Sequence, residues 1–148
     1  MNWTCARLAD LGPLDVYDML ALRSAVFVVE QTCIYLDPDG VDHQAWHLLG
    51  RHDAGPLHAV LRIVDPGVKY TEPSIGRVIS APEVRGTGLG RALVAEGIAR
   101  CGALWPGQGI RISAQARLER FYAEFGFEAH GETYLEDDIP HIEMLRSR

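Results

Sequence analysis

The sequence is short of cysteine, of basic residues and of long apolar runs, and each shortage excludes a class of protein. Its three cysteines, Cys5, Cys33 and Cys101, are an odd, scattered set without C-x-x-C spacing, which disfavours a disulfide framework or a zinc site. Only 14 basic residues stand against 20 acidic ones, giving a formal net charge of −6, so a nucleic acid is not expected as the partner. No run has the length of a membrane span, and the first ten residues lack the pattern of a signal peptide. We therefore expect a cytoplasmic protein with no membrane partner.

The chain also lacks internal repeats, low-complexity segments and long Pro/Gly linkers, so its 148 residues are expected to form a single domain, 1–148. Apolar periodicity and turn signals predict the element order β-α-β-β-β-α-β-α-β-β. This order indicates an α/β (α+β) fold in which helices cover a mixed central sheet. The predicted strands are 3–8, 45–49, 57–65, 75–80, 110–115, 127–131 and 141–145, and the predicted helices are 14–31, 88–103 and 118–125.

Glycine is plentiful, and three glycines alternate in the stretch VRGTGLGRAL at 84–93, between a predicted strand and a predicted helix. Backbone N–H groups of such a loop converge on one point and suit an anion, with Gly88 and Gly90 expected to allow close approach and positive φ. The dinucleotide fingerprint fails because Arg91 and Leu93 stand where its last glycine is required. The Walker pattern fails because G-K-[ST] is missing. A purely structural turn is the alternative.

Two blocks of sequence resemble the GNAT N-acetyltransferases. The run RGTGLG at 85–90 is similar to the family's R/Q-x-x-G-x-G/A signature, and FYAEFGF at 121–127 is similar to its Y-x-x-x-G-F element. Four further runs resemble the ElaA-like branch, so the resemblance covers nearly the whole chain: FVVEQ (27–31), DPDGVD (37–42), SAQARLERFY (113–122) and YLEDDIPHIEM (134–144). It implies the GNAT fold, a mostly antiparallel central sheet with a V-shaped splay, flanked by helices.

The resemblance further implies acetyl-CoA (coenzyme A) as co-substrate and a primary amine of a small molecule or peptide as acceptor, which attacks directly in a ternary complex. The glycine loop would hold the pyrophosphate, the strand before it would pair with pantetheine through its backbone, and two later residues would complete the site. The sequence departs from the family pattern at two of these positions, Ser80 and Gln115, where an apolar residue and Asn are commoner. In chain order, the implied coenzyme-binding residues are Val78, Ile79, Ser80, Arg85, Gly86, Thr87, Gly88, Leu89, Gly90, Arg91, Gln115 and Tyr122.

Some of these side chains have a second interpretation. Arg91 could add charge at the phosphates or be a solvated arginine on the helix surface. Arg23, on the first predicted helix, could anchor substrate or form a structural ion pair.

Catalysis needs a proton donor for the leaving thiolate and a route for the proton of the amine. Tyr122 is the candidate general acid, since a phenol with a pKa of ~10 can protonate a thiolate whose conjugate thiol has a pKa of ~8.5. The alternative interpretation is that Tyr122 is an aromatic residue of the core. Glu30 and His141 are the candidate bases, with water as a third route.

No metal is expected, although His43 and His47 have i, i+4 spacing, because their segment resembles a strand and lacks the H-E-x-x-H glutamate. Two other functions stay open. One is an acyl-homoserine-lactone-synthase-like acyltransferase, which LRSAVFVVEQ resembles, and the other is a binding module that holds acyl-CoA without catalysis. The sequence does not decide between a monomer and a homodimer.

Overall fold

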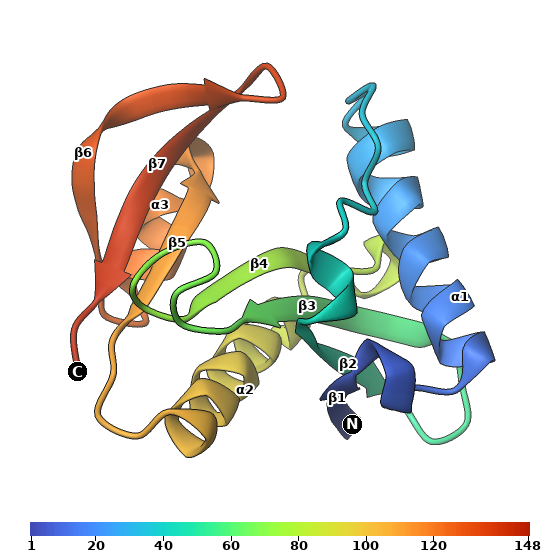
Figure 1. Ribbon diagram of the computed structural model, residues 1–148. Helices are drawn as coiled ribbons and strands as arrows, with labels where there is room; N and C mark the ends of the chain where they lie inside the picture. Colours follow the sequence, from blue (N-terminus) through green and yellow to red (C-terminus); the bar gives the residue numbers. More distant parts are fainter.

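The computed structural model describes residues 1–148, which form two antiparallel sheets that meet along one pair of strands (Figure 1). The first sheet has the order β1-β2-β3-β4 and the second has the order β5-β7-β6. Their strands are β1 (Asn2–Arg7), β2 (Trp46–Arg51), β3 (Leu57–Val64), β4 (Ser74–Ser80), β5 (Ile110–Gln115), β6 (Phe127–Glu136) and β7 (Ile139–Arg146).

The single mixed sheet of the sequence prediction is opened into a V. Strands β4 and β5 begin side by side, where the Arg111 N–H donates to the Pro73 carbonyl at 3.0 Å, and they share no ladder beyond that point. All ladder pairs within the two sheets are antiparallel. This arrangement confirms the predicted GNAT fold class with its splayed, mostly antiparallel sheet.

Helices cover both faces of the first sheet (Figure 1). Because successive residues of a strand face opposite ways, Leu48 and Leu61 pack with α2 (Leu89–Leu104), whereas Leu49 and Val60 pack with α1 (Pro13–Arg23). Strand β3, buried along most of its length, therefore forms the centre of the core. The third helix, α3 (Glu119–Ala123), packs against β6 and β5. None of the helices combines the length and the apolar character needed to cross a bilayer.

The first predicted helix, 14–31, is wrong in its geometry beyond Arg23. There α1 gives way to η2 (Ser24–Glu30), a π-helical segment with wider turns. A pattern of apolar residues at 3.6 spacing does not distinguish the two forms, because only the backbone hydrogen bonding differs. Four short 3₁₀ turns complete the chain: η1 (Leu8–Asp10), η3 (Val41–His43), η4 (Pro82–Val84) and η5 (Ala116–Leu118).

Candidate functional site

A cleft of about 400 Å³ opens where β4 and β5 diverge. We call it the loop lobe, because the two ends of the glycine loop, Arg85 and Gly90, belong to its lining, whereas residues 86–88 lie outside that lining. It brings together eight of the predicted site residues from five separate parts of the chain: Glu30, Val78, Ile79, Ser80, Arg85, Gly90, Gln115 and Tyr122. The other lining residues are Val26, Phe27, Gln31, Arg117, Leu118 and Phe121.

Two smaller hollows, of about 100 Å³ and about 50 Å³, lie on the side of the β6–β7 hairpin. We call them together the hairpin lobe. His141 lines both hollows but not the loop lobe, so the structure separates it from Glu30. Val78 and Tyr122 line both the loop lobe and the larger hollow, which places them at the junction of the two lobes.

The glycine loop has the backbone geometry of an open anion cradle. Gly86 and Gly88 have φ of 82° and 88°, and a Cβ added to either would meet no atom within 4 Å. Gly88 caps α2 without any side-chain hydrogen bond, and the Thr87 hydroxyl donates to the Val84 carbonyl at 2.6 Å instead. The first N–H groups of α2 are therefore free to bind an anion.

One expectation for the glycine loop is wrong, and the Leu89 side chain lies outside the cleft lining. Gly90 lies inside α2 and has no positive φ, so the expected left-handed conformation is found at Gly88 but not at Gly90. Its hydrogen in place of a Cβ faces Ser80, whose Oγ would lie 3.9 Å from an added Cβ. Leu89 packs against the main core rather than lining the cleft.

Both arginines that flank the loop form ion pairs with glutamates. Arg85 donates to Glu30 through both terminal nitrogens, at 2.7 and 3.1 Å, so the carboxylate of this candidate base is engaged. Arg91 donates to Glu124 at 3.0 and 3.2 Å and is outside the cleft lining. The surface interpretation of Arg91 therefore describes this structure better than a phosphate contact.

Strand β4 carries a bulge next to the cleft. Between the pairs Val60↔Ile79 and Arg62↔Gly76, β3 has one residue, Leu61, whereas β4 has two, Arg77 and Val78. Such a bulge interrupts the ladder and re-aims the local backbone. Arg77 has a φ of 51°, which is uncommon for a residue with a side chain.

Tyr122 is a core aromatic that also lines the cleft. Its ring is 7% exposed and makes edge contacts with Phe121 and Phe127, at centroid distances of 5.2 and 6.0 Å, so it belongs to the core. The same residue lines both lobes. Burial raises the pKa of the Tyr122 phenol to about 12, with a smaller opposing effect from Arg117. The phenol therefore carries its proton at neutral pH.

His141 is 7% exposed and held in one orientation in the hairpin lobe. Its Nδ1 lies 2.7 Å from the Ile139 carbonyl, which can only accept, so Nδ1 carries a hydrogen. Its Nε2 lies 3.3 Å from Oε2 of Glu136. The Tyr134 ring stacks on the imidazole at 6.2 Å between centroids. In the neutral tautomer, Nε2 is thus available to accept a proton.

The remaining candidate residues, Arg23, His43 and His47, lie outside both lobes. Arg23 is 1% exposed and donates to Asp37 and Asp42 at 2.7 and 2.8 Å, which supports the structural interpretation over a substrate anchor. The expectation that His43 and His47 share a strand is wrong: His43 lies in η3, and His47 is buried on β2 with Nε2 2.9 Å from the Asp42 carbonyl. The chain has no group of three or more His, Cys, Asp or Glu side chains placed to hold a metal.

The sequence prediction missed several residues that line the two lobes, among them Phe27, Gln31, Arg77 and Glu136. Gln31 accepts a hydrogen bond from Gln115 at 3.2 Å, across 84 positions of sequence. FVVEQ and YLEDD were noted as runs of family resemblance, and that was the only signal for three of these residues. Arg77 had none, because its positive φ is a property of the folded backbone.

Comparisons with known proteins agree with this geometry. Residues 49–147 match the acetyltransferase (GNAT) domain family. A UPF0039 protein of Synechocystis is 46% identical over 98% of this chain and 94% of its own length, and Escherichia coli ElaA is 39% identical over 99% and 96%. The crystal structure of an acyl-CoA N-acyltransferase from Pseudomonas aeruginosa, 43% identical, superimposes with a TM-score of 0.93 over 99% of this chain and all of that one.

Proposed function

Because this chain belongs to the GNAT acetyltransferase family, we propose that it is an acetyl-CoA-dependent N-acetyltransferase acting on a primary amine of a small molecule or peptide. One observation carries the proposal: a single cleft has the ends of an open glycine loop at one edge, a bulged strand along one wall and a protonated tyrosine at its junction with the hairpin lobe. Both sheets contribute to it, so residues 1–148 would act as one domain.

The loop lobe suits the coenzyme. The open space at Gly86 and Gly88 and the free N–H groups of α2 suit a pyrophosphate, with Arg85, next to Gly86 in the chain, as a cation in the cleft lining. Pantetheine would run along the backbone of 78–80, beside Gln115. In this proposal Thr87 and Leu89 contribute backbone groups only, and Arg91 stays with Glu124 at the surface.

Acyl-CoA brings an activated acyl group and a thiolate leaving group, and the chain supplies the charges and protons around them. A backbone N–H donor at the β4 bulge would strengthen its hydrogen bond as negative charge develops on the carbonyl oxygen. Tyr122 would give its Oη proton to the departing sulfur. At its raised pKa the phenol is a weaker acid than a free tyrosine, but it is fully protonated before transfer.

The acceptor would enter through the hairpin lobe, which meets the loop lobe at Val78 and Tyr122. His141 Nε2 would take the amine proton, directly or through water, because Nδ1 already holds a hydrogen and the Glu136 carboxylate, 3.3 Å from Nε2, would stabilise the charged ring that results. Glu30 is less suited to this role, since it lines only the loop lobe and is paired with Arg85. Direct attack fits this arrangement, because the two lobes meet where the acyl group would lie.

A screen of primary amines and short peptides with acetyl-CoA, followed by free-thiol release, tests the proposal. We expect thiol release that depends on the amine and a product heavier by one acetyl group in mass spectrometry. Turnover with an acyl carrier protein and no amine-dependent use of acetyl-CoA would favour the acyl-homoserine-lactone-synthase alternative. Binding of acetyl-CoA with no thiol release for any amine would favour a non-catalytic binding module.

A further inference from the structure

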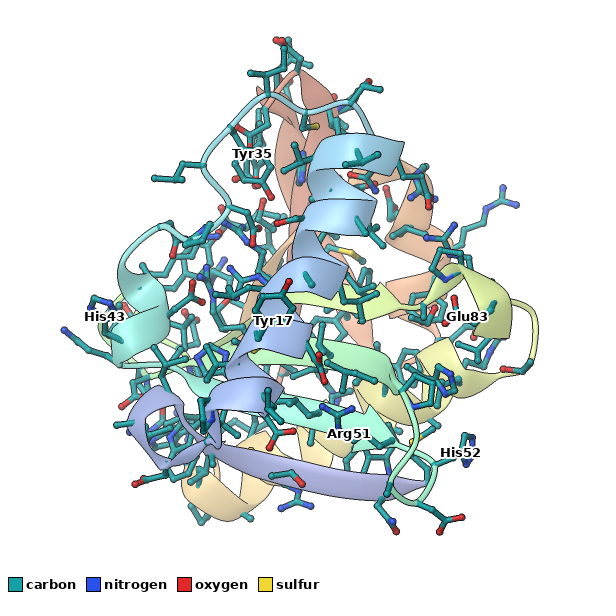
Figure 2. The ribbon with its side chains drawn as sticks, turned by 90° about the vertical axis from the view of Figure 1, so that its right-hand side faces the viewer. Tyr17, Tyr35, His43, Arg51, His52 and Glu83 are labelled. Atoms are coloured by element: carbon teal, nitrogen blue, oxygen red, sulfur yellow. The ribbon has the colours of Figure 1, made fainter.

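The strained residue of the β4 bulge, Arg77, has a side chain tied to a different part of the molecule. Its Nη2 donates to the Asp37 carbonyl at 3.1 Å and to Oδ2 of Asp39 at 3.3 Å. Its Nε lies 2.9 Å from Oδ1 of Asp37, at an angle that falls short of a hydrogen bond. The guanidinium also lies over the Tyr35 ring, 5.6 Å from its centroid. Figure 2 shows Tyr35 on the loop that follows η2, beside the η2 turns at the upper end of the helix.

These contacts belong to a balanced ion network of three arginines and three aspartates. Arg23 bonds Asp37 and Asp42, and Arg62 bonds Asp39 and Asp42, with distances of 2.7 to 3.1 Å. The network joins α1, the loop before β2, β3 and the bulge. Paired charges at this depth hold well-defined positions, because breaking one pair leaves a buried charge unsatisfied.

A positive φ at a residue with a side chain persists only when the surroundings impose it. Glycine would adopt this φ without strain, so the backbone alone does not call for arginine at position 77. Its contacts do, because they hold the Nε–Nη2 edge of the guanidinium against the loop. The next residue, Val78, lines both lobes.

On the premise of the proposed function, we infer that Arg77 is a positioning residue that holds the β4 bulge and so aims the Val78 peptide at the acyl carbonyl. Arg77 itself would touch no reacting atom. It acts by fixing the backbone through the Asp37–Asp39 loop. The loop thereby becomes part of the catalytic arrangement although Asp37 and Asp39 line neither the loop lobe nor the larger hollow.

The test is Arg77→Gly, which accepts the bulge φ but loses every side-chain contact. Asp37 keeps Arg23 and Asp39 keeps Arg62, so no buried carboxylate is left alone and the variant is expected to fold. We expect kcat to fall on the order of 10-fold, less than the ~10²–10³-fold that follows outright removal of an oxyanion donor. The KM for acetyl-CoA and calorimetric affinity for coenzyme A should change less than about 3-fold, since the glycine loop is untouched. Arg77→Lys, which retains a cation for Asp37, should recover part of kcat.

Arg51→Gly is the matched control. Arg51 also donates to two aspartates, and its side chain is 21% exposed against 20% for Arg77. It lies at the opposite end of the continuous helix α1–η2 from Tyr35 (Figure 2). It should lose stability without loss of kcat. An unchanged kcat in Arg77→Gly, or an equal fall in Arg51→Gly, would overturn the inference.

A spectroscopic readout separates this inference from the proposed function. The carbonyl stretching band of bound ¹³C-labelled acetyl-CoA should lie at lower frequency in the native protein than in Arg77→Gly, because only the native bulge donates a well-aimed hydrogen bond. Identical bands would contradict the role of Arg77 even if the native protein acetylates amines. Failure of the proposed function would instead appear in the native protein, as absence of thiol release with every amine.

Discussion

At the edge of the loop lobe the polar groups are backbone N–H groups and an exposed ion pair, whereas a buried ion network lies behind the hairpin lobe. The glycine loop relies on left-handed backbone at Gly86 and Gly88, and its Arg85–Glu30 pair is more than 40% exposed on both sides. Behind the hairpin lobe, Arg23 and Asp37 are each 1% exposed in their ion pair. Exposed pairs contribute little to stability and rearrange readily, but buried pairs hold one geometry.

The difference indicates a division of labour between the lobes. A flexible coenzyme with several charges suits an adaptable edge of N–H donors and exposed cations. The acyl carbonyl and the amine must instead meet within a few tenths of an ångström, which suits a wall whose side chains cannot move independently. We therefore expect substitutions in the loop lobe to change binding and substitutions at the junction or in the hairpin lobe to change rate.

Tyr122→Phe should have the largest effect, because it removes the proton donor at the junction and keeps the packing with Phe121 and Phe127. We expect kcat to fall by roughly 10²-fold, while the KM for acetyl-CoA moves far less. Steady-state kinetics with any accepted amine measures this, with the exposed Tyr17→Phe as the matched control. An acyl donor with a more acidic thiol should restore part of the lost rate. A near-native kcat would mean that Tyr122 is a core aromatic and not the general acid.

In the native protein, the Tyr122 phenol should also stay protonated, and so able to act as the acid, up to alkaline pH. Burial raises the pKa of Tyr122 to about 12, so the phenol stays protonated at pH ~10, where a free tyrosine is half ionised. A pH–rate profile measured in buffers of equal ionic strength should therefore show no loss of activity between pH 8 and 10 that is caused by ionisation of Tyr122. A descending limb in that range that disappears in Tyr122→Phe would contradict this expectation.

Gly88→Val should weaken coenzyme binding about tenfold or more, equivalent to ~1.4 kcal/mol. The valine Cβ would stand where a phosphate must approach the backbone, and the residue would resist φ of 88°. Gly107→Val is the matched control, because Gly107 has φ of 79° and an equally open Cβ position but lies after α2, away from the cleft. Both variants should lose about 1–3 kcal/mol of folding stability. Calorimetric titration with coenzyme A should find weakened binding only for Gly88→Val, and equal affinities would refute the cradle.

His141→Gln should have an intermediate effect on rate. Glutamine retains a polar group near Ile139 and Glu136 but cannot accept a proton at neutral pH. We expect kcat/KM for the amine to fall about tenfold, because water replaces part of the lost base, with coenzyme A affinity unchanged. Glu136→Gln tests whether the neighbouring carboxylate supports His141, and its loss should be smaller. If His141→Gln retains the native kcat/KM, proton removal proceeds through water alone.

Glu30→Gln should have the smallest effect on rate. Its carboxylate is engaged with Arg85 in the loop lobe, away from the hairpin lobe where the amine would enter. We expect kcat to change less than about 3-fold and coenzyme A affinity to rise slightly, since Arg85 is released for a phosphate. Kinetics and calorimetry on this single variant decide the matter. A large fall in kcat would make Glu30, and not His141, the base.

The sequence was sufficient to predict features that depend on residues close together in the chain. Apolar periodicity located every strand and three helices, although the ends of β6 and β7 extend further than predicted because ladder pairing with a neighbour lengthens a strand. The glycine spacing at 86–90 predicted a tight loop before α2, and the expected positive φ is found at Gly88 but not at Gly90, because helix α2 includes Gly90. The spacing of Tyr122 from Gly126 identified the helix that carries the candidate acid.

Tertiary structure alone decided which distant residues share a lobe. Nothing near Glu30 in sequence indicates that Arg85, 55 positions away, neutralises it, and nothing near His141 places it on the far side of the junction. Arg77 is the clearest case. It has a strained φ, it is one of the two bulge residues on β4, and it donates to Asp37 and Asp39. These features arise only when β3, β4 and the loop pack together. Contacts of this kind depend on loop closure and burial of paired charges, which no short window of sequence contains.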